Sequence, residues 1–189
     1  WTLPEAEEAN CTEKIWRLPE TRLCFTVPDV DIDVAPLPAL ATGRITFGSF
    51  QNPNKFEAAV VALWAKVLQA VPESRLLLKT KQRGNAEIRQ RVKDCFAGNG
   101  IDPDRLEFEG ASSRAEYLAT YHRVDIVLDT FPFPGGTTTV ESLWMGVPVL
   151  TLAGSSFLSR QGLGLLTTAG LPDWIATDTD DYVARASAH

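Results

Sequence analysis

Residues 124–152 read VDIVLDTFPFPGGTTTVESLWMGVPVLTL, and this stretch decides the fold class. Residues 124–128 form a near-continuous apolar run of strand length, residues 137–145 have helical character, and residues 147–152 form a second apolar run. Gly146 follows the helix, at a place where glycine commonly ends one. Strand, helix and strand in this order predict a parallel βαβ unit, whose strands are apolar because both faces are covered.

The same alternation extends over most of the chain. Apolar residues recur at helical spacing after one short strand-like run and before the next, and Ser113 with Glu116 has the spacing of a capping box. We therefore predict an α/β fold with a doubly wound, Rossmann-like parallel sheet and helices on both faces. The predicted strands are 45–48, 76–78, 106–108, 124–128 and 147–152, and the predicted helices are 56–71, 88–96, one from Ser113, 137–145, 159–169 and 180–188.

Residues 1–43 differ from the rest because they are rich in proline and acidic side chains. Residues 29–42 contain Pro36 and Pro38 and lack a helical period, which predicts an extended linker. We therefore expect an extended N-terminal arm over residues 1–43 and one α/β domain over residues 44–189.

Bulk properties exclude several classes of protein. The 189 residues suffice for one sizeable domain, and a net charge of −6 argues against a large nucleic-acid footprint, which needs clustered Lys and Arg. No apolar run approaches the length of a membrane span. Three cysteines without a C-x-x-C pair favour a reducing, cytoplasmic compartment, with Cys95 expected on the apolar face of its helix. The chain starts at Trp1 rather than Met, so we expect it to be part of a longer protein.

Ligands of doubly wound sheets bind beyond the carboxyl ends of the strands, so the loops there hold the candidate site. The first loop, residues 48–55, places Lys55 at a helix N-terminus, where the helix dipole disfavours a cation. A neighbouring diphosphate would explain this lysine, and a solvated side chain is the alternative. Lys79 follows the second strand directly, with Lys81 and Arg83 nearby, and for these residues a strand-end charge reaching water is the alternative.

The loop after the fourth strand carries Gly135, Gly136 and three threonines at the start of a helix. Glycines permit a ligand to approach the backbone closely, and free N–H groups at a helix N-terminus attract phosphate. Glu141, about one turn into the helix, is placed to accept hydrogen bonds from a ribose. A helix capped by Thr is the alternative, but it does not explain the whole cluster. The loop contains neither G-x-x-x-x-G-K-[ST] nor G-x-G-x-x-G.

Residues 128–148, LDTFPFPGGTTTVESLWMGVP, resemble the donor-site signature of the O-GlcNAc transferase and SPINDLY family of glycosyltransferases. ITFGSF at residues 45–50 and LAG at residues 152–154 are similar to the same family, and the resemblance spans residues 44–186. It implies the second lobe of a GT-B glycosyltransferase. On this basis, residues 1–43 would be the inter-lobe segment and residues 44–189 the nucleotide-sugar-binding lobe.

The resemblance also implies roles for individual residues. Lys55 would pair with the diphosphate and stabilise the departing nucleotide, and Asn52 would assist. Thr137 and Thr138 would hydrogen-bond phosphate, and Glu141, where O-GlcNAc transferases have Asp, would hold the ribose. The same nucleotide-sugar site would include Lys79, Gly135 and Gly136.

Four further residues are matched to the nucleoside by the resemblance. Arg114 and Tyr117 match a Lys and a His that lie against the nucleotide, and Ala111 and Ser112 match backbone that reads the base. Tyr117 and Gly136 each stand where the family has a His, so base stacking and phosphate contacts are expected to differ.

Catalysis in this family also requires the other lobe, which supplies an active-site His and much of the acceptor cleft. This chain has only His122, expected to be structural, and His189, its last residue. It also lacks a repeat of about 34 residues, which would mark a tetratricopeptide array. We therefore expect the isolated chain to be inactive. The resemblance implies catalysis without a metal, and we expect no metal or cofactor. No Asp-x-Asp motif follows a predicted strand, since Asp31 and Asp33 lie in the linker as solvated charges.

The sequence leaves the donor open between UDP-GlcNAc and GDP-fucose. Phe50, residues 78–81 and the threonines at 137–139 are at least as similar to SPINDLY proteins, for which a guanine nucleotide fits. Two other functions stay open: a nucleotide-binding module without transfer, and a nucleotide-sugar epimerase of similar architecture. The expected partners are a nucleotide sugar and, through the other lobe and the repeats, an acceptor protein. Nucleic acid and membrane are not expected.

Overall fold

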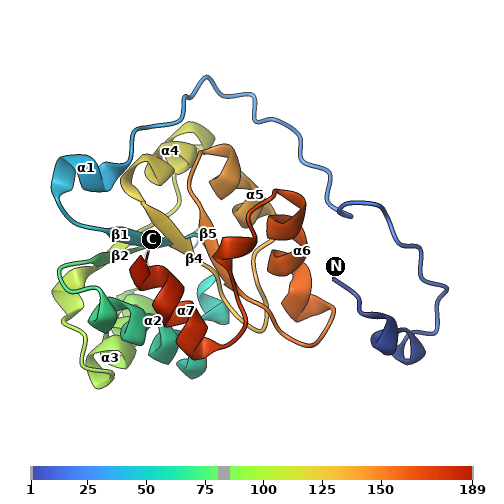
Figure 1. Cartoon of the computed structure of the whole chain (residues 1–189). Coiled ribbons are helices and arrows are strands. Elements are labelled where there is room, and N and C mark those ends of the chain that lie inside the picture. Colours follow the sequence, from blue (N-terminus) through green and yellow to red (C-terminus); the bar gives the residue numbers. More distant parts are fainter. Residues whose placement is uncertain (1, 81–85, 189) are drawn as a thin grey trace.

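The computed structural model describes residues 2–80 and 86–188, which contain a six-stranded sheet covered by helices on both faces (Figure 1). The strand order is β3-β2-β1-β4-β5-β6, and every neighbouring pair is parallel. The strands are β1 (Thr46–Ser49), β2 (Arg75–Lys79), β3 (Leu106–Glu109), β4 (Ile126–Leu128), β5 (Val149–Leu152) and β6 (Ile175–Ala176). The predicted doubly wound α/β fold is thus confirmed.

The order of the strands reverses between β1 and β4, which lie side by side at the centre of the sheet. In open parallel sheets, ligands bind in the crevice at this switch point, outside the carboxyl ends of the strands. The loops that follow β1 and β4 therefore face each other where a ligand is expected.

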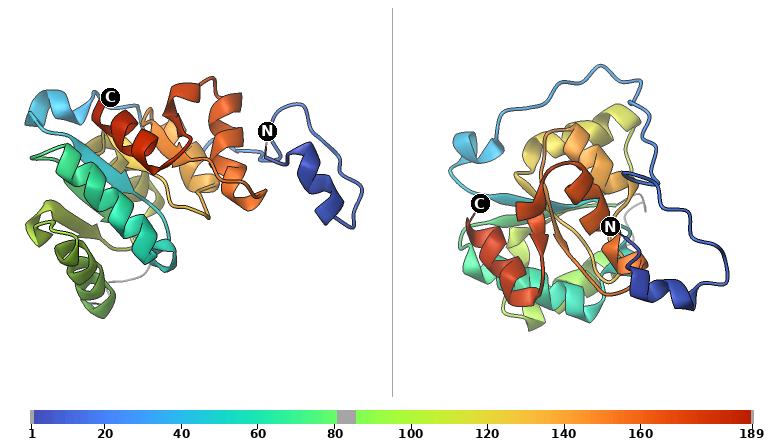
Figure 2. Two further views of the ribbon diagram at one scale, coloured as in Figure 1. Left: turned by 60° about the horizontal axis from the view of Figure 1, so that its bottom comes forward. Right: turned by 45° about the vertical axis from the view of Figure 1, so that its right-hand side comes forward.

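Two groups of helices cover the sheet (Figure 2). One core cluster joins one face of the sheet to α2 (Ala58–Ala70), α3 (Ala86–Gly98) and α7 (Thr179–Ala188). The other joins the opposite face to α4 (Arg114–Ala119), α5 (Thr137–Trp144) and α6 (Gln161–Thr168). The three leucines of β2 show the two-residue period behind this division, because Leu76 and Leu78 belong to the first cluster and Leu77 to the second.

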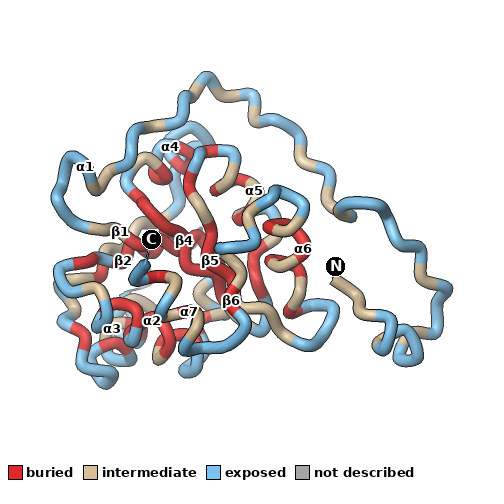
Figure 3. Tube along the Cα trace, viewed as in Figure 1, coloured by how far each residue is buried: buried red, intermediate tan, exposed pale blue. Residues whose placement is uncertain are grey.

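The buried residues follow the strands and the inner faces of the helices (Figure 3). Trp64 of α2 is fully buried and packs edge-on against Phe56, with 5.4 Å between the ring centroids. Each large apolar side chain buried in this way contributes about 1.5–3 kcal/mol relative to its exposed state. The two-sided core explains why the strands are apolar throughout.

The N-terminal arm runs along the outside of the domain before it enters β1 (Figure 1). It contains the 3-10 helix η1 (Glu5–Asn10) and the short helix α1 (Pro38–Thr42). The backbone N–H groups of Ala39 and Thr46 both donate to the buried carboxylate of Asp125, each at 2.8 Å. This one side chain ties the end of the arm to the amino end of the sheet.

Three expectations from the sequence are corrected by the structure. The linker predicted over residues 29–42 ends in α1, because Pro38 is accepted in a first helical turn. The strand β6 was not predicted; its two residues, paired with β5, are too short for a periodic pattern. Cys95 is exposed, since α3 buries only Val92 and Phe96. The division at residue 43 stays a prediction.

Candidate functional site

The loop after β1 turns back on itself and presents Lys55. Pro53 opens the 3-10 helix η2 (Pro53–Lys55), and the side chain of Asn52 accepts a hydrogen bond from the Asn54 N–H at 3.0 Å. Phe50 anchors the base of the loop, because its ring stacks on Tyr121 with 3.8 Å between centroids. Lys55 is thus held beside the carboxyl end of the sheet, as the sequence predicted, but it is the last residue of η2 and not the start of a helix, because the next helix begins only at Ala58.

The ammonium of Lys55 is partly buried among acceptors from two loops. Its Nζ donates to Gln51 Oε1 at 3.0 Å and to the Pro134 carbonyl at 3.2 Å, and it lies 3.9 Å from the centroid of the Phe133 ring. Burial lowers the pKa of Lys55, and the nearby charge of Asp129 opposes that shift. An ammonium has three N–H donors, so the two acceptors leave one for a ligand.

The loop after β4 is organised around the buried carboxylate of Asp129. Its Oδ1 accepts hydrogen bonds from the N–H groups of Thr130 at 3.0 Å and Gly135 at 2.7 Å. Its Oδ2 accepts the Thr151 hydroxyl at 2.9 Å. Burial raises the pKa of Asp129 to about 6, against the effect of these hydrogen bonds. These hydrogen bonds hold the loop in place from its buried side; the loop includes a cis Phe131–Pro132 peptide bond.

Gly135 is required by internal packing. A Cβ at this position would lie 2.3 Å from Gln51 Nε2, 2.5 Å from Thr138 Oγ1 and 2.7 Å from Thr139 Oγ1. The sequence suggested that both glycines admit a ligand; at Gly135 the space is taken by these polar side chains. Gly136 is more open, because a Cβ there would meet only Leu23 Cδ1 at 3.7 Å.

The N-terminus of α5 lacks the side-chain cap that the alternative interpretation of this loop predicted. Gly136 occupies the N-cap position and provides no side-chain hydrogen bond. The first N–H groups of a helix have no intrahelical partner, so they stay available to an anion. The buried hydroxyls of Thr139 and Ser49 also lack a partner among the described residues. Thr137 is exposed, and Thr138 Oγ1 accepts from Gln51 Nε2 at 2.9 Å.

Glu141 lies one turn along α5 and is already paired. Arg114 Nη1 donates to its Oε1 at 2.7 Å, and the Tyr117 hydroxyl donates to its Oε2 at 2.9 Å. Burial raises the pKa of the Tyr117 phenol, so the hydroxyl stays protonated and can donate. The structure thus brings together Glu141, Arg114 and Tyr117, three of the five residues that the resemblance matched to the nucleoside.

The other predicted site residues lie on β2, in the loop before α4 and in the loop after β1. Lys79 is buried and forms an ion pair with Glu109, with 3.0 Å between Nζ and Oε2. Ala111 and Ser112 are exposed in the loop before α4, whose N-terminus carries the predicted capping box. The side chain of Asn52 is exposed and caps η2. Lys81 and Arg83 lie outside the described residues.

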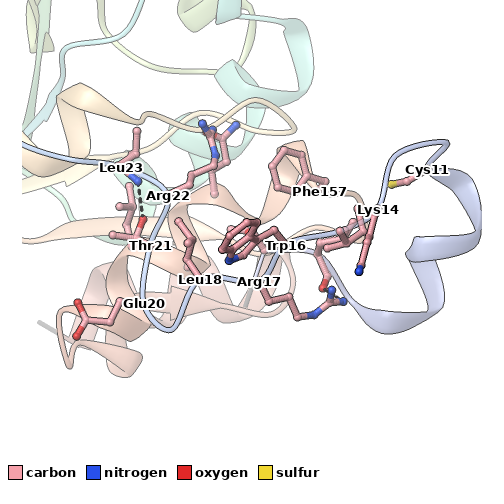
Figure 4. A pocket seen from close by; sticks show the side chains of 16 residues that line it. Cys11, Lys14, Trp16, Arg17, Leu18, Glu20, Thr21, Arg22, Leu23 and Phe157 are labelled. Carbon is pink, nitrogen blue, oxygen red and sulfur yellow. Dashed lines mark hydrogen bonds between the residues drawn. The ribbon is translucent and has the colours of Figure 1, made fainter.

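Residues of the N-terminal arm line a pocket together with Phe157 (Figure 4). Arg22 donates to Gln161 on α6, and its guanidinium carbon lies 5.6 Å from the centroid of the Phe157 ring. Arm and α6 enclose a hollow of about 420 Å³, whose wall includes Leu23, the neighbour of Gly136. The arm therefore reaches the start of α5.

Within residues 2–80 and 86–188, no three His, Cys, Asp or Glu side chains gather in a way that could hold a metal ion. Over the same ranges, no helix combines the length and apolar character needed to cross a membrane. His122, in the 3-10 helix η4 (Thr120–Arg123), lies with Nε2 2.8 Å from the Asp33 carbonyl of the arm.

Two residues of the site escaped the sequence reasoning. Gln51 lies in a loop that was considered only for Lys55 and Asn52, and Asp129 is the second residue of the signature block, to which no role was given. The available signal was the position of each, directly after an apolar strand at the carboxyl edge of the sheet. Their buried contacts became visible only in the structure.

A parallel sheet of this strand order, with polar loops at its switch point, defines a Rossmann-like lobe of the kind found in GT-B glycosyltransferases. Residues 36–188 match Glycosyl transferase family 41, and the chain belongs to that family. The resemblance noted in the sequence is confirmed, as is the assignment to glycosyltransferases, which the match favours over the epimerase alternative.

Named relatives agree with this assignment. The chain is 40% identical over 184 residues to the Probable UDP-N-acetylglucosamine–peptide N-acetylglucosaminyltransferase SPINDLY of Petunia hybrida, covering 97% of this chain and 20% of that protein. It is 32% identical to the UDP-N-acetylglucosamine–peptide N-acetylglucosaminyltransferase of Caenorhabditis elegans, over 78% of this chain and 12% of that protein.

A solved structure shows the same fold. A mutant O-GlcNAc transferase of Thermobaculum terrenum superimposes with a TM-score of 0.91 at 33% identity, over 99% of this chain and 35% of that one. The chain therefore spans only a fraction of the length of the relatives and the structure that it matches.

Proposed function

We propose that this chain is the donor-binding lobe of a protein O-glycosyltransferase, which transfers a sugar from a nucleotide to Ser or Thr of an acceptor protein. The observation that carries the proposal is the convergence of Lys55 on the loop leading to the uncapped N-terminus of α5. The Lys55 ammonium and the partial positive charge of the α5 N-terminus come from distant parts of the chain and meet there. A diphosphate is the ligand that both would bind.

These elements would act mainly when the sugar leaves. As the bond between sugar and diphosphate breaks, negative charge grows on the leaving oxygen. The Lys55 ammonium and the N–H groups of α5 would offset that charge without rearranging, since Lys55 is already held by Gln51 and Pro134. Preorganised donors of this kind are often the largest contribution to catalysis.

The nucleoside would lie farther along the same edge of the sheet. Glu141 would accept hydrogen bonds from the ribose, and Arg114 and Tyr117 would lie against the nucleoside from α4. Ala111 and Ser112, exposed before α4, would read the base through their backbone. Lys79 would act near the site while paired with Glu109.

We propose UDP-GlcNAc as the donor, because the plant and nematode relatives carry that donor in their names. GDP-fucose is the alternative. The acceptor protein would bind through a second lobe and tetratricopeptide repeats, and the isolated chain would bind nucleotide without transferring sugar. We further propose that the protein acts in the cytoplasm without a metal or cofactor.

Calorimetric titration of the chain with UDP, GDP and their sugar conjugates tests the proposal. Binding of UDP and UDP-GlcNAc alone supports the proposed donor, whereas binding of GDP alone moves the assignment to a fucosyl donor. Binding of none by a folded sample contradicts the donor-binding role of the isolated chain. For the whole protein, a mass increase on Ser or Thr of an acceptor distinguishes a transferase from a binding module.

A further inference from the structure

Asp129 is a buried residue that connects several segments of the candidate site, and the proposed chemistry does not use it directly. Its side chain is almost inaccessible to solvent and accepts hydrogen bonds from the β4 loop, from β5 and from the β1 loop. The contact to the β1 loop comes from Gln51 Nε2, at 3.2 Å from Oδ1, although the two residues are 78 positions apart. A carboxylate in this place therefore links both halves of the candidate site.

Gln51 also forms hydrogen bonds with two residues of the proposed diphosphate site, Thr138 and Lys55. Its Nε2 also donates to Thr138 Oγ1 at 2.9 Å, and its Oε1 accepts from Lys55 Nζ at 3.0 Å. One buried amide thus contacts the carboxylate, the cation and the first turn of α5.

The carboxylate decides which way this amide points. An ionised carboxylate only accepts hydrogen bonds and an ammonium only donates them, whereas an amide has one side of each kind. Turning the Gln51 amide over would set Oε1 against Asp129 Oδ1 and the NH₂ group against Lys55. Both contacts would be repulsive, so Asp129 and Lys55 together select the observed orientation.

We propose that Asp129 and Gln51 are positioning residues, which together hold the Lys55 ammonium and the Thr138 hydroxyl in place for a diphosphate. The inference rests on the proposed function of Lys55. Neither Asp129 nor Gln51 touches the ligand in this arrangement, because Asp129 is enclosed and the amide of Gln51 is already used on both sides.

The substitution Asp129→Asn separates this role from a structural one. Asparagine has nearly the same shape and can still accept hydrogen bonds from Gly135, Thr130 and Gln51 through Oδ1, while the Thr151 hydroxyl turns to accept from its NH₂ group. The loop keeps its partners, but the negative charge near Lys55 is lost. Asp125→Asn is the control for the loss of a buried carboxylate far from Lys55, since Asp125 lies at the amino end of the sheet; there the amide keeps only one of the two backbone N–H contacts, to Ala39 or to Thr46.

The first measurement needs no ligand. In the chain labelled with ¹³C-lysine, the pH titration of the Lys55 side-chain signals is followed by NMR. The charge of Asp129 favours the protonated form of Lys55, so its loss in Asp129→Asn should move the Lys55 midpoint down by about one pH unit. Asp125→Asn should leave the midpoint unchanged. An unchanged midpoint in folded Asp129→Asn overturns the proposal. Should that variant not fold, Gln51→Leu replaces it and should lower the Lys55 midpoint as well.

The second measurement is the affinity of the same proteins for UDP and GDP by calorimetry. Asp129→Asn and Gln51→Leu should each weaken binding about tenfold, as expected for the loss of a charge-assisted arrangement, and Asp125→Asn should not. Full affinity in both variants overturns the positioning role. If the unsubstituted chain binds neither nucleotide, the proposed function fails, and the titration of Lys55 still decides whether Asp129 and Gln51 position the lysine.

Discussion

Arg114 and Glu141 form an ion pair of 2.7 Å between α4 and α5, with the arginine side chain 46% exposed and the glutamate only 6%. The buried carboxylate therefore faces the candidate nucleoside site through a cation that can move toward solvent. A ribose hydroxyl that donates to Glu141 would add to this pair or displace Arg114. In either case the Glu141 carboxylate acts as an acceptor.

Glu141→Gln should reduce the preference for ribose. A hydrogen bond from a neutral hydroxyl to a charged acceptor is worth about 1.5–3 kcal/mol, so the native chain should bind UDP at least about tenfold more tightly than 2′-deoxy-UDP. The variant should lose most of that difference. Calorimetry with both nucleotides measures it, and the exposed Glu57→Gln is the control. Equal binding of the two nucleotides by the native chain would exclude the ribose role.

Lys55→Met should weaken the binding of UDP by about ten- to a hundredfold, because a partly buried charge-assisted contact to phosphate is lost. Stability should change little, since burial of the ammonium already lowers the pKa of Lys55 and thus opposes the charged form. Affinity and urea unfolding are measured on the same samples. Lys66→Met, at an exposed position of α2, is the control. Native affinity in Lys55→Met would contradict the diphosphate assignment.

Stability should depend on pH through Asp129. Burial raises its pKa from 3.8 to about 6, so the folded state binds the proton more tightly than the unfolded chain. The resulting stabilisation is complete below about pH 4 and is lost as the pH rises to about 6. The difference between the folded and unfolded pKa values corresponds to roughly 3 kcal/mol in the free energy of unfolding. The titratable neighbours are Lys55, whose pKa is lowered by burial, and Tyr182, whose pKa is raised by burial.

Asp129→Asn removes this titration. Relative to the native chain, the variant should gain up to about 3 kcal/mol in the free energy of unfolding between pH 4 and pH 7.5. Urea unfolding at both pH values tests this, with Asp125→Asn in parallel. A stability difference that is the same at both pH values would show that Asp129 keeps an ordinary pKa. A gain in stability together with a loss of affinity would indicate a buried charge kept for function.

Features that depend on residues close together in the chain could be predicted from the sequence, whereas features that depend on distant residues could not. Strands such as residues 76–78 and the capping box at Ser113 depend on local pattern, and each was found where it was predicted. The two-residue strand β6 exists only through its pairing with β5, so its own residues carry little signal.

The candidate site shows the same limit. Lys55 and Glu141 were singled out because a charged residue near a predicted helix is visible in sequence, and their roles stay predictions. The contact of Gln51 with Asp129 depends on two rotamers and on loops that meet at the switch point, and no periodic pattern encodes it. The capped alternative for α5 failed for a related reason, since Thr138 Oγ1 accepts from Gln51 rather than from the start of its own helix.

The adjacent glycines of the β4 loop should respond differently to the same substitution. In Gly135→Ala, the new Cβ would press on Gln51, Thr138 and Thr139 at 2.3–2.7 Å, so these side chains must leave their present contacts. Overpacking of this kind typically costs about 1–3 kcal/mol, and the displaced Gln51 amide should also weaken nucleotide binding.

Gly136→Ala meets only Leu23, at 3.7 Å, and should cost less than about 1 kcal/mol, the difference expected between glycine and alanine at an N-cap. Urea unfolding and UDP titration of both variants give the comparison. Equal losses would mean that the β4 loop adjusts freely around Gly135. A loss confined to Gly135→Ala would indicate that the packing of Gln51 against this loop sets the geometry in which Lys55 meets the start of α5.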